Sequence, residues 1–550
     1  MLDVKTFDRA AYAAKMRANG WWGDRTTDSL LMEAVAQHPD KDAIVAYRAD
    51  RRDQPPRRFT FSEFGDSVAR AAGALHALGV GAGDIVAVQV PNWWEFAVMV
   101  FACGRIGAVV NPLMPILRER ELSFMLAMNE AKVFVVPKVF RGFDYEAMAR
   151  ALQPKLPKLA HLIVVDGDGE NGFDRMLLAR GATVPATLSA AKEPAKAEDL
   201  AVLMFTSGTA GEPKGVMHSS NSLIACVSGL RDRFELTEKD VILACSPLGH
   251  MTGYAASLLQ GLCLGMTVAL LDVWDAEHAV AIMNAEGVTH TAAATPFLAD
   301  ICEAVAAGAP NPRLRTFLCA GATIPPALIE RALRELGLPV SSLWGMTESL
   351  ASTLTEPSRA TEKSSSTDGR PLEGVEVRVV DSSDSSPLPA GETGRLLVRG
   401  AQMFIGYYRR PDLPTFDADG WFDTGDLAYA DAEGYIRING RAKDVLIRGG
   451  ENVPVVEIEN LLYKHPAVAA VALVGFPDKR LGERGCAFVA LRPGQRFDLP
   501  ELRRYMDECK VAKPYWPERV EVVDELPRTA SGKIQKFALR ERAKAFGDAL

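Results

Sequence analysis

Residues 206–215, Thr-Ser-Gly-Thr-Ala-Gly-Glu-Pro-Lys-Gly, are of the types that bind a polyphosphate. Three glycines, three hydroxyl side chains and one lysine on a short loop supply exposed backbone N–H groups and a cation. The apolar run 201–205 precedes them and predicts a strand that leads into the loop. The segment is not a Walker A loop, because Pro213 stands in place of the second glycine and no serine or threonine follows Lys214. The sequence therefore predicts a phosphate-binding loop of another kind.

Further polar segments follow at 344–348 (Trp-Gly-Met-Thr-Glu), 424–426 (Thr-Gly-Asp), 440–453 and 527–536. A carboxylate such as that of Asp426 accepts from two vicinal hydroxyls at once, which suits the ribose of a nucleotide. A lone Thr-Gly-Asp turn is usually a surface loop and a lone linker lysine is usually solvated, so each segment alone indicates little. Their order along the chain is the informative feature.

In this order the segments resemble the signature of the adenylate-forming superfamily, which includes acyl-CoA synthetases, amino-acid adenylation domains and firefly-type luciferases. The resemblance runs from Thr206 to Lys533 and so covers most of the chain. It implies a ligase that uses ATP to convert a carboxylic acid into an acyl-adenylate, releasing pyrophosphate, and then transfers the acyl group to the thiol of coenzyme A, releasing AMP. The cofactors that it implies are ATP, Mg²⁺ and coenzyme A.

The resemblance also implies which residues take part in the chemistry. Lys533 would bridge the acid and the α-phosphate, where a cation offsets the repulsion between two anionic reactants. Glu348 would hold Mg²⁺ between phosphate oxygens, and Thr206 belongs to the same catalytic set. Trp344 would stack on adenine, although tyrosine is the usual aromatic residue of the family at this position.

Other residues are expected to bind the nucleotide or coenzyme A. Arg441 would reach the nucleotide, Lys443 would absorb a rotation of the backbone, and two glycines would let pantetheine pass close to the main chain. The expected cofactor-binding residues are Ser207, Gly208, Thr209, Gly211, Lys214, Trp344, Gly345, Thr347, Asp426, Arg441, Lys443, Gly449 and Gly450.

Residues 246–254 and 319–323 resemble the segments that border the acyl group in this family. His250 would gate or contact the acid, or it is a structural histidine, and the sequence leaves both readings open. The expected acid-contacting residues are His250, Tyr254, Ala320, Gly321, Ala322, Leu343 and Met346. The small residues Ala320, Gly321 and Ala322 leave room for a bulky acid, and the possible walls of the pocket are Tyr254, Leu343 and Met346. The expected substrate is a cyclic, branched or medium-chain carboxylic acid. The first tryptophans, in Gly-Trp-Trp-Gly-Asp-Arg-Thr at 20–26, resemble the opening of ligases for cyclohexanecarboxylate and related acids, although adjacent tryptophans more often pack than bind.

The main alternative is an adenylation enzyme that loads a carrier protein. An amino-acid module would need a carboxylate near His250 to hold an α-ammonium group, and residues 247–254 contain none. A nucleotide-binding scaffold without catalysis is disfavoured because Glu348, Asp426 and Lys533 are all present. Oxidative luciferase chemistry shares the same motifs. The sequence leaves the oligomeric state open between monomer and homodimer.

Composition excludes several other classes of protein. The 550 residues include 62 Lys and Arg against 70 Asp and Glu, and a net charge of −8 argues against nucleic acid as the main partner. The eight cysteines are scattered without a CxxC pair, which argues against a zinc site or a disulfide framework. The uncharged stretch 254–271 holds polar residues and turns β-branched, so it predicts a buried helix and strand and no membrane span. With no signal peptide evident at the start, we expect a cytoplasmic protein.

The elements that must position these residues follow an alternating pattern. A helix is expected over 61–72 and strands over 84–90, 133–136, 161–165 and 289–293, which predicts α/β layers with largely parallel sheets.

Further along the chain the pattern changes to β-rich and then α+β. Alternating strands are expected over 375–380 and 394–399, and beyond 440 a helix over 456–463, strands over 468–474 and 487–491, and a helix over 500–509. We therefore expect an α/β fold with a large N-terminal domain (1–440) of layered α/β subdomains plus a β-rich subdomain. A small, mobile α+β C-terminal domain (441–550) would follow, with its hinge at Lys443.

Overall fold

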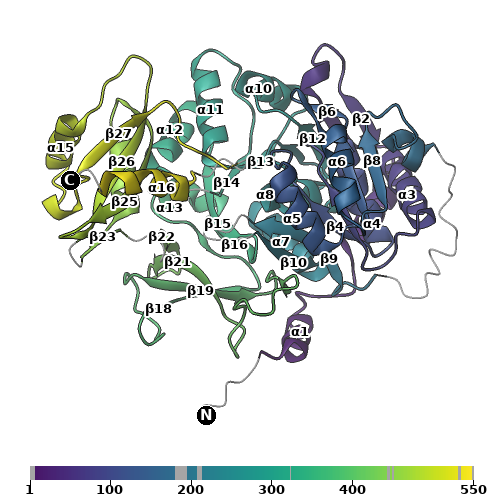
Figure 1. The fold of residues 1–550 in the computed structure, drawn as a ribbon, viewed down its shortest axis with the longest axis horizontal. Coiled ribbons are helices and arrows are strands. Elements are labelled where there is room, and N and C mark those ends of the chain that lie inside the picture. Colours follow the sequence, from purple (N-terminus) through teal and green to yellow (C-terminus); the bar gives the residue numbers. More distant parts are fainter. Residues whose placement is uncertain are drawn as a thin grey trace.

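β-Sheets of nine, seven, four and five strands organise the part of the chain that the computed structural model describes, which is residues 7–179, 195–206, 213–321, 324–441, 446–448, 451–529 and 534–547. We call them the first, second, third and fourth sheets. Figure 1 shows the third sheet at the lower edge of the molecule and the fourth at the left, with helices packed over the first and second. The predicted fold class, α/β layers followed by β-rich and α+β parts, is confirmed.

The first sheet has the strand order β17-β16-β15-β14-β13-β11-β12-β1-β2. Neighbouring strands pair in parallel across the sheet from β15 to β1, whereas β2 at one edge and β16 and β17 at the other pair antiparallel. Strands β12 and β14 are buried at every residue, as expected for parallel strands covered on both faces. The strands are β1 Asp42–Tyr47, β2 Arg57–Thr60, β11 Val241–Ala244, β12 Thr267–Leu271, β13 His290–Ala293, β14 Thr316–Cys319, β15 Val340–Met346, β16 Leu350–Leu354 and β17 Arg370–Pro371.

The second sheet has the order β20-β10-β9-β4-β3-β5-β8, parallel from β9 to β8 and antiparallel at β10 and β20. Its strands are β3 Ile85–Val88, β4 Val109–Pro112, β5 Val133–Pro137, β8 His161–Val165, β9 Leu200–Thr206, β10 Lys214–Ser219 and β20 Gly406–Tyr407. A short hairpin, β6 Val139–Phe140 with β7 Phe143–Asp144, stands apart. The strand expected over 201–205 is thus β9, and the phosphate-loop candidate connects it to β10.

Helices cover both sheets where apolar residues recur at helical spacing. The predicted helix at 61–72 forms and continues to Ala77, and a capping box starts it, because Thr60 Oγ1 accepts from the Glu63 N–H and Glu63 accepts from the Thr60 N–H. The α-helices are α1 Arg9–Ala18, α2 Thr27–Gln37, α3 Phe61–Ala77, α4 Trp94–Arg105, α5 Glu119–Asn129, α6 Tyr145–Leu152, α7 Ser220–Phe234, α8 Met251–Gly253, α9 Gln260–Cys263, α10 Ala276–Ala285, α11 Thr295–Ala306, α12 Pro326–Leu336 and α13 Ala360–Lys363.

The uncharged stretch 254–271 is a buried helix followed by a buried strand, as predicted. It runs through a π-helical segment, η4 Tyr254–Leu259, into α9 and then into β12. Among the described residues, no helix is both long and apolar enough to cross a membrane. All eight cysteines lie in described parts of the chain, where each is a free thiol and all but Cys509 are buried.

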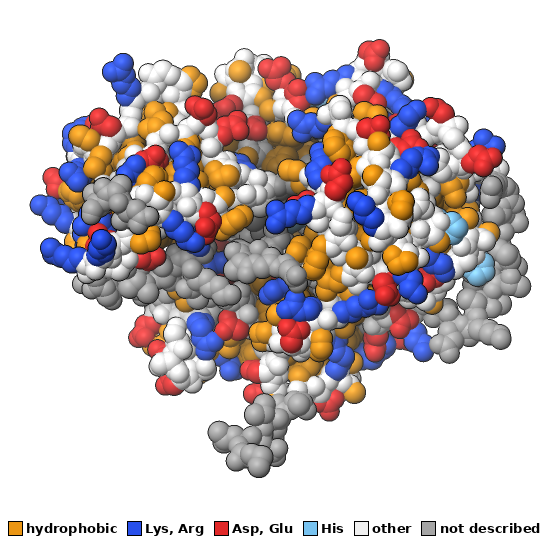
Figure 2. All heavy atoms as spheres, viewed as in Figure 1, with side chains coloured by type: hydrophobic (Ala, Val, Ile, Leu, Met, Phe, Trp, Pro, Cys, Tyr) orange, Lys and Arg blue, Asp and Glu red, His pale blue; other side chains and the backbone are white. Residues whose placement is uncertain are grey.

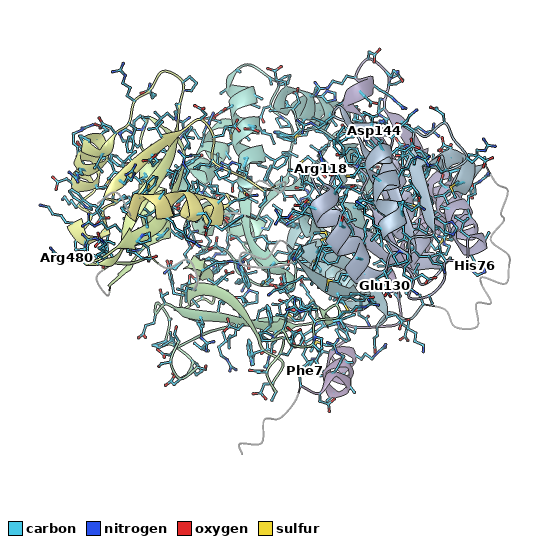
Figure 3. The ribbon with its side chains drawn as sticks, in the orientation of Figure 1. Phe7, His76, Arg118, Glu130, Asp144 and Arg480 are labelled. Atoms are coloured by element: carbon cyan, nitrogen blue, oxygen red, sulfur yellow. The ribbon has the colours of Figure 1, made fainter. Side chains whose placement is uncertain are left out.

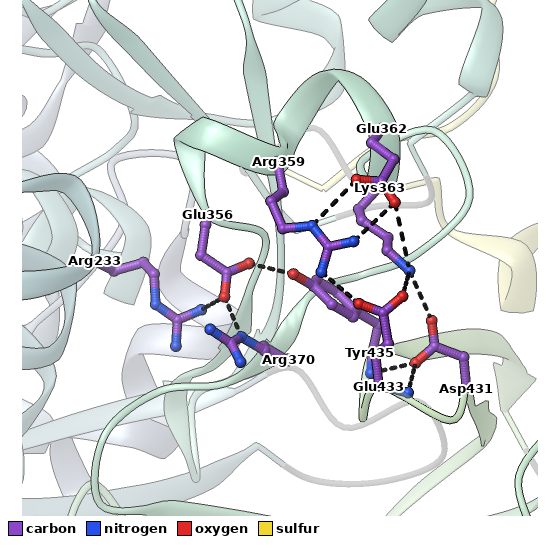
Figure 4. A network of polar contacts seen from close by, with 9 residues as sticks. All are labelled: Arg233, Glu356, Arg359, Glu362, Lys363, Arg370, Asp431, Glu433 and Tyr435. Carbon is purple, nitrogen blue, oxygen red and sulfur yellow. Dashed lines mark hydrogen bonds and ion pairs between the residues drawn. The ribbon is translucent and has the colours of Figure 1, made fainter.

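The third sheet, in the order β18-β19-β21-β22, is the predicted β-rich part. Its strands are β18 Val375–Val380, β19 Gly394–Gly400, β21 Phe422–Ala430 and β22 Ile436–Arg441. An ion-pair network joins the segment after β16 to the turn between β21 and β22 (Figure 4). Lys363 Nζ lies 2.6 Å from Glu433 and 3.2 Å from Asp431, and Tyr435 Oη donates to Glu356 at 2.6 Å. The network fixes the turn that precedes β22, and β22 ends at Arg441.

The N-terminal helix α1 packs against the edge of the third sheet. Phe7, which Figure 3 labels beside this helix, contacts Tyr12 and Phe416. The Tyr12 hydroxyl both accepts from the Gly400 N–H and donates to the Gly400 carbonyl. Trp22 Nε1 donates to the Ala401 carbonyl at 2.8 Å. The paired tryptophans therefore serve as a packing anchor.

The fourth sheet has the order β24-β23-β26-β25, with β27 paired to β26. The strands β25 and β26 are longer than the sequence predicts, because their antiparallel ladder continues without a break from the core to the pair Asp478 and Gly482. The elements are β23 Leu446–Arg448, β24 Glu451–Val453, α14 Val455–Tyr463, β25 Val468–Asp478, β26 Gly482–Leu491, α15 Leu499–Glu508, β27 Arg519–Val523 and α16 Lys536–Gly547.

Glu95, in the first turn of α4, is a carboxyl group buried in the core. Its Oε2 atom has no hydrogen-bond partner among the described residues, and burial raises the pKa of Glu95 to about 8, against weaker opposing effects of a backbone hydrogen bond and of Arg48. The folded protein therefore keeps a proton on Glu95 at a pH where the unfolded chain has released it.

We predict that the free energy of unfolding of the wild type falls, relative to that of Glu95→Gln, as the pH rises from the ordinary pKa of glutamate towards about 8. The sign follows because ionisation of Glu95 costs more in the fold than in the unfolded chain, whereas glutamine does not ionise. Urea unfolding at several pH values measures the difference. Glu277→Gln, at an exposed glutamate in the first turn of α10, should show no such trend. Parallel pH profiles for wild type and Glu95→Gln would contradict the prediction.

Candidate active site

A large cavity of about 1380 Å³ is lined by residues of the first, second and third sheets and of the region that carries the fourth sheet. Figure 2 shows a hollow near the centre of this face of the molecule. The predicted site residues that line the cavity are Thr206, Lys214, His250, Ala320, Gly321, Leu343, Trp344, Gly345, Met346, Thr347, Glu348, Asp426 and Arg441. Segments separated by more than two hundred residues thus meet at one cavity.

Nine of the predicted site residues lie outside the described part of the chain. They are Ser207, Gly208, Thr209, Gly211, Ala322, Lys443, Gly449, Gly450 and Lys533. Described residues that flank some of these positions do line the cavity. Thr206 and Lys214 flank the predicted residues 207–211, and Thr529 and Ile534 lie on either side of Lys533.

Tyr254, expected as a wall of the acid pocket, is not among the residues that line the cavity. The π-helical turn of η4 presents Ala255 and Ala256 to the cavity instead. Tyr254 is buried near the thiols of Cys103 and Cys263, and burial raises the pKa of its phenol.

Glu348, Tyr407 and Lys214 form a cluster on the phosphate-loop side of the cavity. The Tyr407 hydroxyl donates to Glu348 Oε1 at 2.9 Å, and Lys214 Nζ lies 5.0 Å from the centre of the Tyr407 ring. Burial and the nearby Glu348 charge raise the pKa of Tyr407, so this phenol stays protonated and remains a donor. Lys214 pairs with Thr206 across the strands β9 and β10, which holds both ends of the predicted phosphate loop at the cavity.

His218 holds the segment 344–348 through a hydrogen bond to its backbone. It is fully buried on β10, where its Nε2 lies 2.7 Å from the Thr347 carbonyl and its Nδ1 lies 3.0 Å from Ser222 Oγ. Burial lowers the pKa of His218 to about 4, so the ring is neutral at physiological pH. A neutral ring facing a carbonyl must carry its proton on Nε2, and the ring therefore donates to Thr347 and fixes the backbone next to Glu348.

Gly345 allows the segment 344–348 to lie close to the backbone of β16. A Cβ atom at this position would lie 1.9 Å from the Leu350 carbonyl oxygen, because a bulge between β15 and β16 brings the two strands together there. Any other residue would push Trp344 and Met346 away from their places in the cavity.

Trp344, Asp426 and Arg441 meet on the third-sheet side of the cavity. The Trp344 indole Nε1 donates to Asp426 Oδ2 at 2.8 Å, and Arg441 Nε lies 3.0 Å from Asp426 Oδ1. The turn before Asp426 is fixed locally, since Thr424 Oγ1 accepts from the Asp426 N–H and donates to the Leu396 carbonyl, and Gly425 takes a left-handed φ of 72°.

One end of the cavity, which we call the acyl recess, is apolar. It lies where α7 packs against η4 and β16. Its lining residues are Cys226, Met251, Ala255, Ala256, Leu350 and Ala351, all buried. Among these described residues none is charged. His250 stands beside the recess, where its Nδ1 accepts from the Thr252 N–H and so caps α8.

Sequence reasoning missed His218, Tyr407 and most of the acyl recess. Tyr407 lies in Gly-Tyr-Tyr at 406–408, and nothing in that segment signals a partner 59 residues earlier in the chain. His218 lies four residues beyond Lys214 and a search of the strand after the phosphate loop for polar residues in an apolar pattern would have found it.

Two family models match most of the chain. Residues 31–408 match the family described as AMP-binding enzyme, and residues 457–533 match the AMP-binding enzyme C-terminal domain. The chain belongs to the AMP-binding enzyme family. This confirms the predicted membership of the adenylate-forming superfamily.

Relatives of this AMP-binding enzyme include ligases and adenylating enzymes. The medium-chain fatty-acid–CoA ligase of Escherichia coli is 35% identical over 97% of this chain and 92% of its own. The salicyl-AMP ligase / salicyl-S-ArCP synthetase of Mycobacterium tuberculosis is 34% identical over 96% of this chain and 92% of its own. Among solved structures, the anthranilate CoA ligase AuaEII with anthranoyl-AMP has a TM-score of 0.86 at 26% identity, covering 96% of this chain and 98% of its own. ATP-bound MatB from Rhodopseudomonas palustris has a TM-score of 0.83 at 28% identity, covering 95% and 100%.

These matches confirm the prediction of an ATP-dependent, AMP-forming acid–CoA ligase, and they leave the acid unspecified. The relatives differ in both acid and acceptor, because one name states a fatty acid and coenzyme A and another states salicylate and a carrier protein.

We predict that His218→Ala lowers the free energy of unfolding by about 1–3 kcal/mol, because the Thr347 carbonyl loses its buried donor. It should also lower the rate of ATP–pyrophosphate exchange, since Glu348 is the next residue. His218→Gln, which keeps an N–H donor, should recover part of both. The control is His290→Ala, at another fully buried histidine that does not line the cavity. If both alanine variants lose stability equally and neither loses exchange activity, His218 has no role at the site.

Proposed function

We propose that this AMP-binding enzyme activates an apolar carboxylic acid as an acyl-adenylate and transfers the acyl group to the thiol of coenzyme A. The observation that carries the proposal is the single cavity in which Thr206, Lys214, Glu348 and Asp426 stand beside an apolar acyl recess. Such a cavity holds a nucleotide at one end and a hydrophobic acid at the other, with their reacting groups between.

In the proposed first step the acid's carboxylate attacks the α-phosphorus of ATP, the bond to the β-phosphate oxygen breaks, and pyrophosphate leaves. The loop 206–215 binds the phosphates through its backbone N–H groups and Lys214, and Asp426 accepts from the ribose hydroxyls. Lys533 bridges the two anionic reactants and stabilises the charge of the transition state. Support for the role of Lys533 comes from its described neighbours Thr529 and Ile534, which line the cavity.

Glu348 suits Mg²⁺ in this proposal. Mg²⁺ prefers oxygen ligands and is commonly held by one or two carboxylates together with substrate phosphates and water. Glu348 offers a buried carboxylate whose Oε1 is oriented by Tyr407. Among the described residues, no group of three or more His, Cys, Asp and Glu side chains could hold a metal ion, so the phosphates and water would complete the coordination. When bound there, the ion would neutralise part of the phosphate charge.

In the proposed second step residues 441–550 rotate as a domain about Lys443, and the coenzyme A thiol attacks the acyl carbonyl and displaces AMP. The rotation would withdraw Lys533 and bring Gly449 and Gly450 to the cavity, where their lack of a Cβ admits pantetheine. The end of the third sheet at Arg441 and the start of the fourth at Leu446 support a division of domains 1–440 and 441–550 at this point.

The acid is proposed to be cyclic, branched or medium-chain, with no charged group other than its reacting carboxylate. A hydroxyl or carboxylate in the acyl recess would lose its hydrogen bonds to water without gaining a partner from these side chains. The Escherichia coli relative, named for medium-chain fatty acids, supports this choice. The alternative acceptor is a carrier protein, as in the name of the Mycobacterium tuberculosis relative, and it predicts thioester formation with a phosphopantetheinyl carrier and none with free coenzyme A.

We predict that Lys533→Ala abolishes ATP–pyrophosphate exchange and largely spares thioester formation from a supplied acyl-adenylate, because the lysine is needed only where two anions meet. Separate assays of the two half-reactions measure this. Lys479→Ala, at an exposed lysine of the same region, should change neither. Equal loss of both half-reactions in Lys533→Ala would assign the lysine a structural role.

We also predict that Ala256→Phe lowers kcat/KM for a medium-chain acid by more than about tenfold while sparing a short one, because the ring fills space that two or more methylenes would occupy. Release of free coenzyme A thiol across a panel of acids measures the change. Ala281→Phe, at an exposed alanine of α10, is the control and should leave the panel unaltered. A uniform loss over all chain lengths would show that the recess is not the acyl site.

A further inference from the structure

The carboxylate of Asp426 is held by the indole of Trp344. Trp344 belongs to β15 in the first sheet and Asp426 to β21 in the third, 82 residues apart in the chain. Their hydrogen bond is 2.8 Å long and buried, since Trp344 is 8% and Asp426 5% exposed. Arg441 contacts the other oxygen at 3.0 Å. Each oxygen of this carboxylate therefore has its own donor.

The identity of the aromatic residue matters for this contact. Phenylalanine has no donor, and tyrosine carries its hydroxyl at the far tip of the ring, whereas the indole N–H lies on the side of the five-membered ring. A hydrogen bond from N–H to a carboxylate is charge-assisted and is stronger than one between neutral groups. Of the aromatic residues, only tryptophan combines a large flat face with an N–H donor at this place.

We propose that Trp344 is a positioning residue that orients Asp426 for the ribose hydroxyls of ATP, and so sets the preference for ATP over 2′-deoxyATP. This inference rests on the proposed function, in which Asp426 accepts from the ribose. A carboxylate that is already fixed at one torsion angle loses no rotational freedom when it accepts from two vicinal hydroxyls. Because that entropic cost is avoided, the affinity for the nucleotide is higher than with a freely rotating carboxylate. Substrate with only one of the two hydroxyls gains less from that orientation.

Further contacts hold the backbone of Asp426. Thr424 fixes the turn through the Asp426 N–H, and Gly425 provides the left-handed residue. Arg441 is less restrained, because its side chain is 45% exposed, whereas Trp344 is enclosed by the core. Of these two donors to the carboxylate, the indole is therefore the more rigid.

The test compares kcat/KM for ATP and for 2′-deoxyATP in the exchange assay, with wild type and Trp344→Phe. Phenylalanine keeps an aromatic face for adenine and removes the N–H. We expect kcat/KM to fall for ATP more than for 2′-deoxyATP, so that the ratio between them drops about fivefold. In an Asp426→Ala background the same substitution should leave the ratio unchanged, because the two residues act as one unit.

Two further measurements keep the test independent of folding. Incorporation at position 344 of benzothienylalanine, an isosteric tryptophan analogue that has sulfur in place of the N–H, should lower the ratio to the same extent as phenylalanine. The matched control is Trp93→Phe, which removes an indole N–H that donates to Asp272 at 2.9 Å outside the cavity lining, and it should leave the ratio at the wild-type value.

An unchanged ratio with benzothienylalanine, or equal losses for the two nucleotides in Trp344→Phe, would overturn the inference and leave Trp344 with a stacking or packing role only. Absence of any ATP–pyrophosphate exchange in the wild type with every acid tested would instead overturn the proposed function. The two failures are therefore distinguishable.

Discussion

A carboxylate and a nucleoside triphosphate repel each other, and the charged groups of the cavity bear on that repulsion. In water, solvent and counterions screen the two charges, but a site that orients them must supply its own compensation. The described side of the cavity supplies Lys214 and Arg441 as cations, and Glu348 as a carboxylate suited to a divalent ion. The remaining compensation is proposed to come from the amides of the loop 206–215 and from Lys533.

The sheets decide where these groups stand. Parallel strands place their carboxyl ends at a common edge, and β14 and β15 of the first sheet deliver Ala320, Gly321 and Trp344 to the cavity from that edge. In the second sheet, Thr206 and Lys214 lie opposite each other on the antiparallel strands β9 and β10, and both line the cavity. The third sheet closes the arrangement, because Asp426 and Arg441 face each other on β21 and β22.

Buried polar contacts then fix the orientation of the groups that the strands deliver. His218 holds the Thr347 carbonyl, Tyr407 holds Glu348, and Trp344 holds Asp426, and each of these contacts joins residues more than fifty positions apart. The surface network of Figure 4 has a different role. Its partly exposed ion pairs contribute little to stability individually, but together they anchor the turn at Asp431 and Glu433 that leads into β22 and Arg441.

The sequence by itself determined the chemistry and the order of the parts. The sequence predicts the nucleotide-binding groups at 206–215, at 344–348 and at Asp426, since the residue types that meet phosphate and ribose are few. Apolar runs identified the strands β5 and β8, and alternating patterns identified β18 and β19, all within a residue of their observed ends. Helical spacing identified α3 from its first residue, although the helix continues five residues further than predicted. These features are local, and local spacing is what a sequence records directly.

Only the tertiary structure decided which residues touch. The π-helical turn of η4 put Ala255 and Ala256 at the acyl recess and turned Tyr254 away, and no pattern of apolar residues distinguishes that turn from an ordinary one. Tyr407, His218 and the indole N–H of Trp344 gained their partners from strands of other sheets. The physical reason is that these contacts depend on how separate sheets pack, and packing is a property of three-dimensional distances that residue spacing along the chain does not contain.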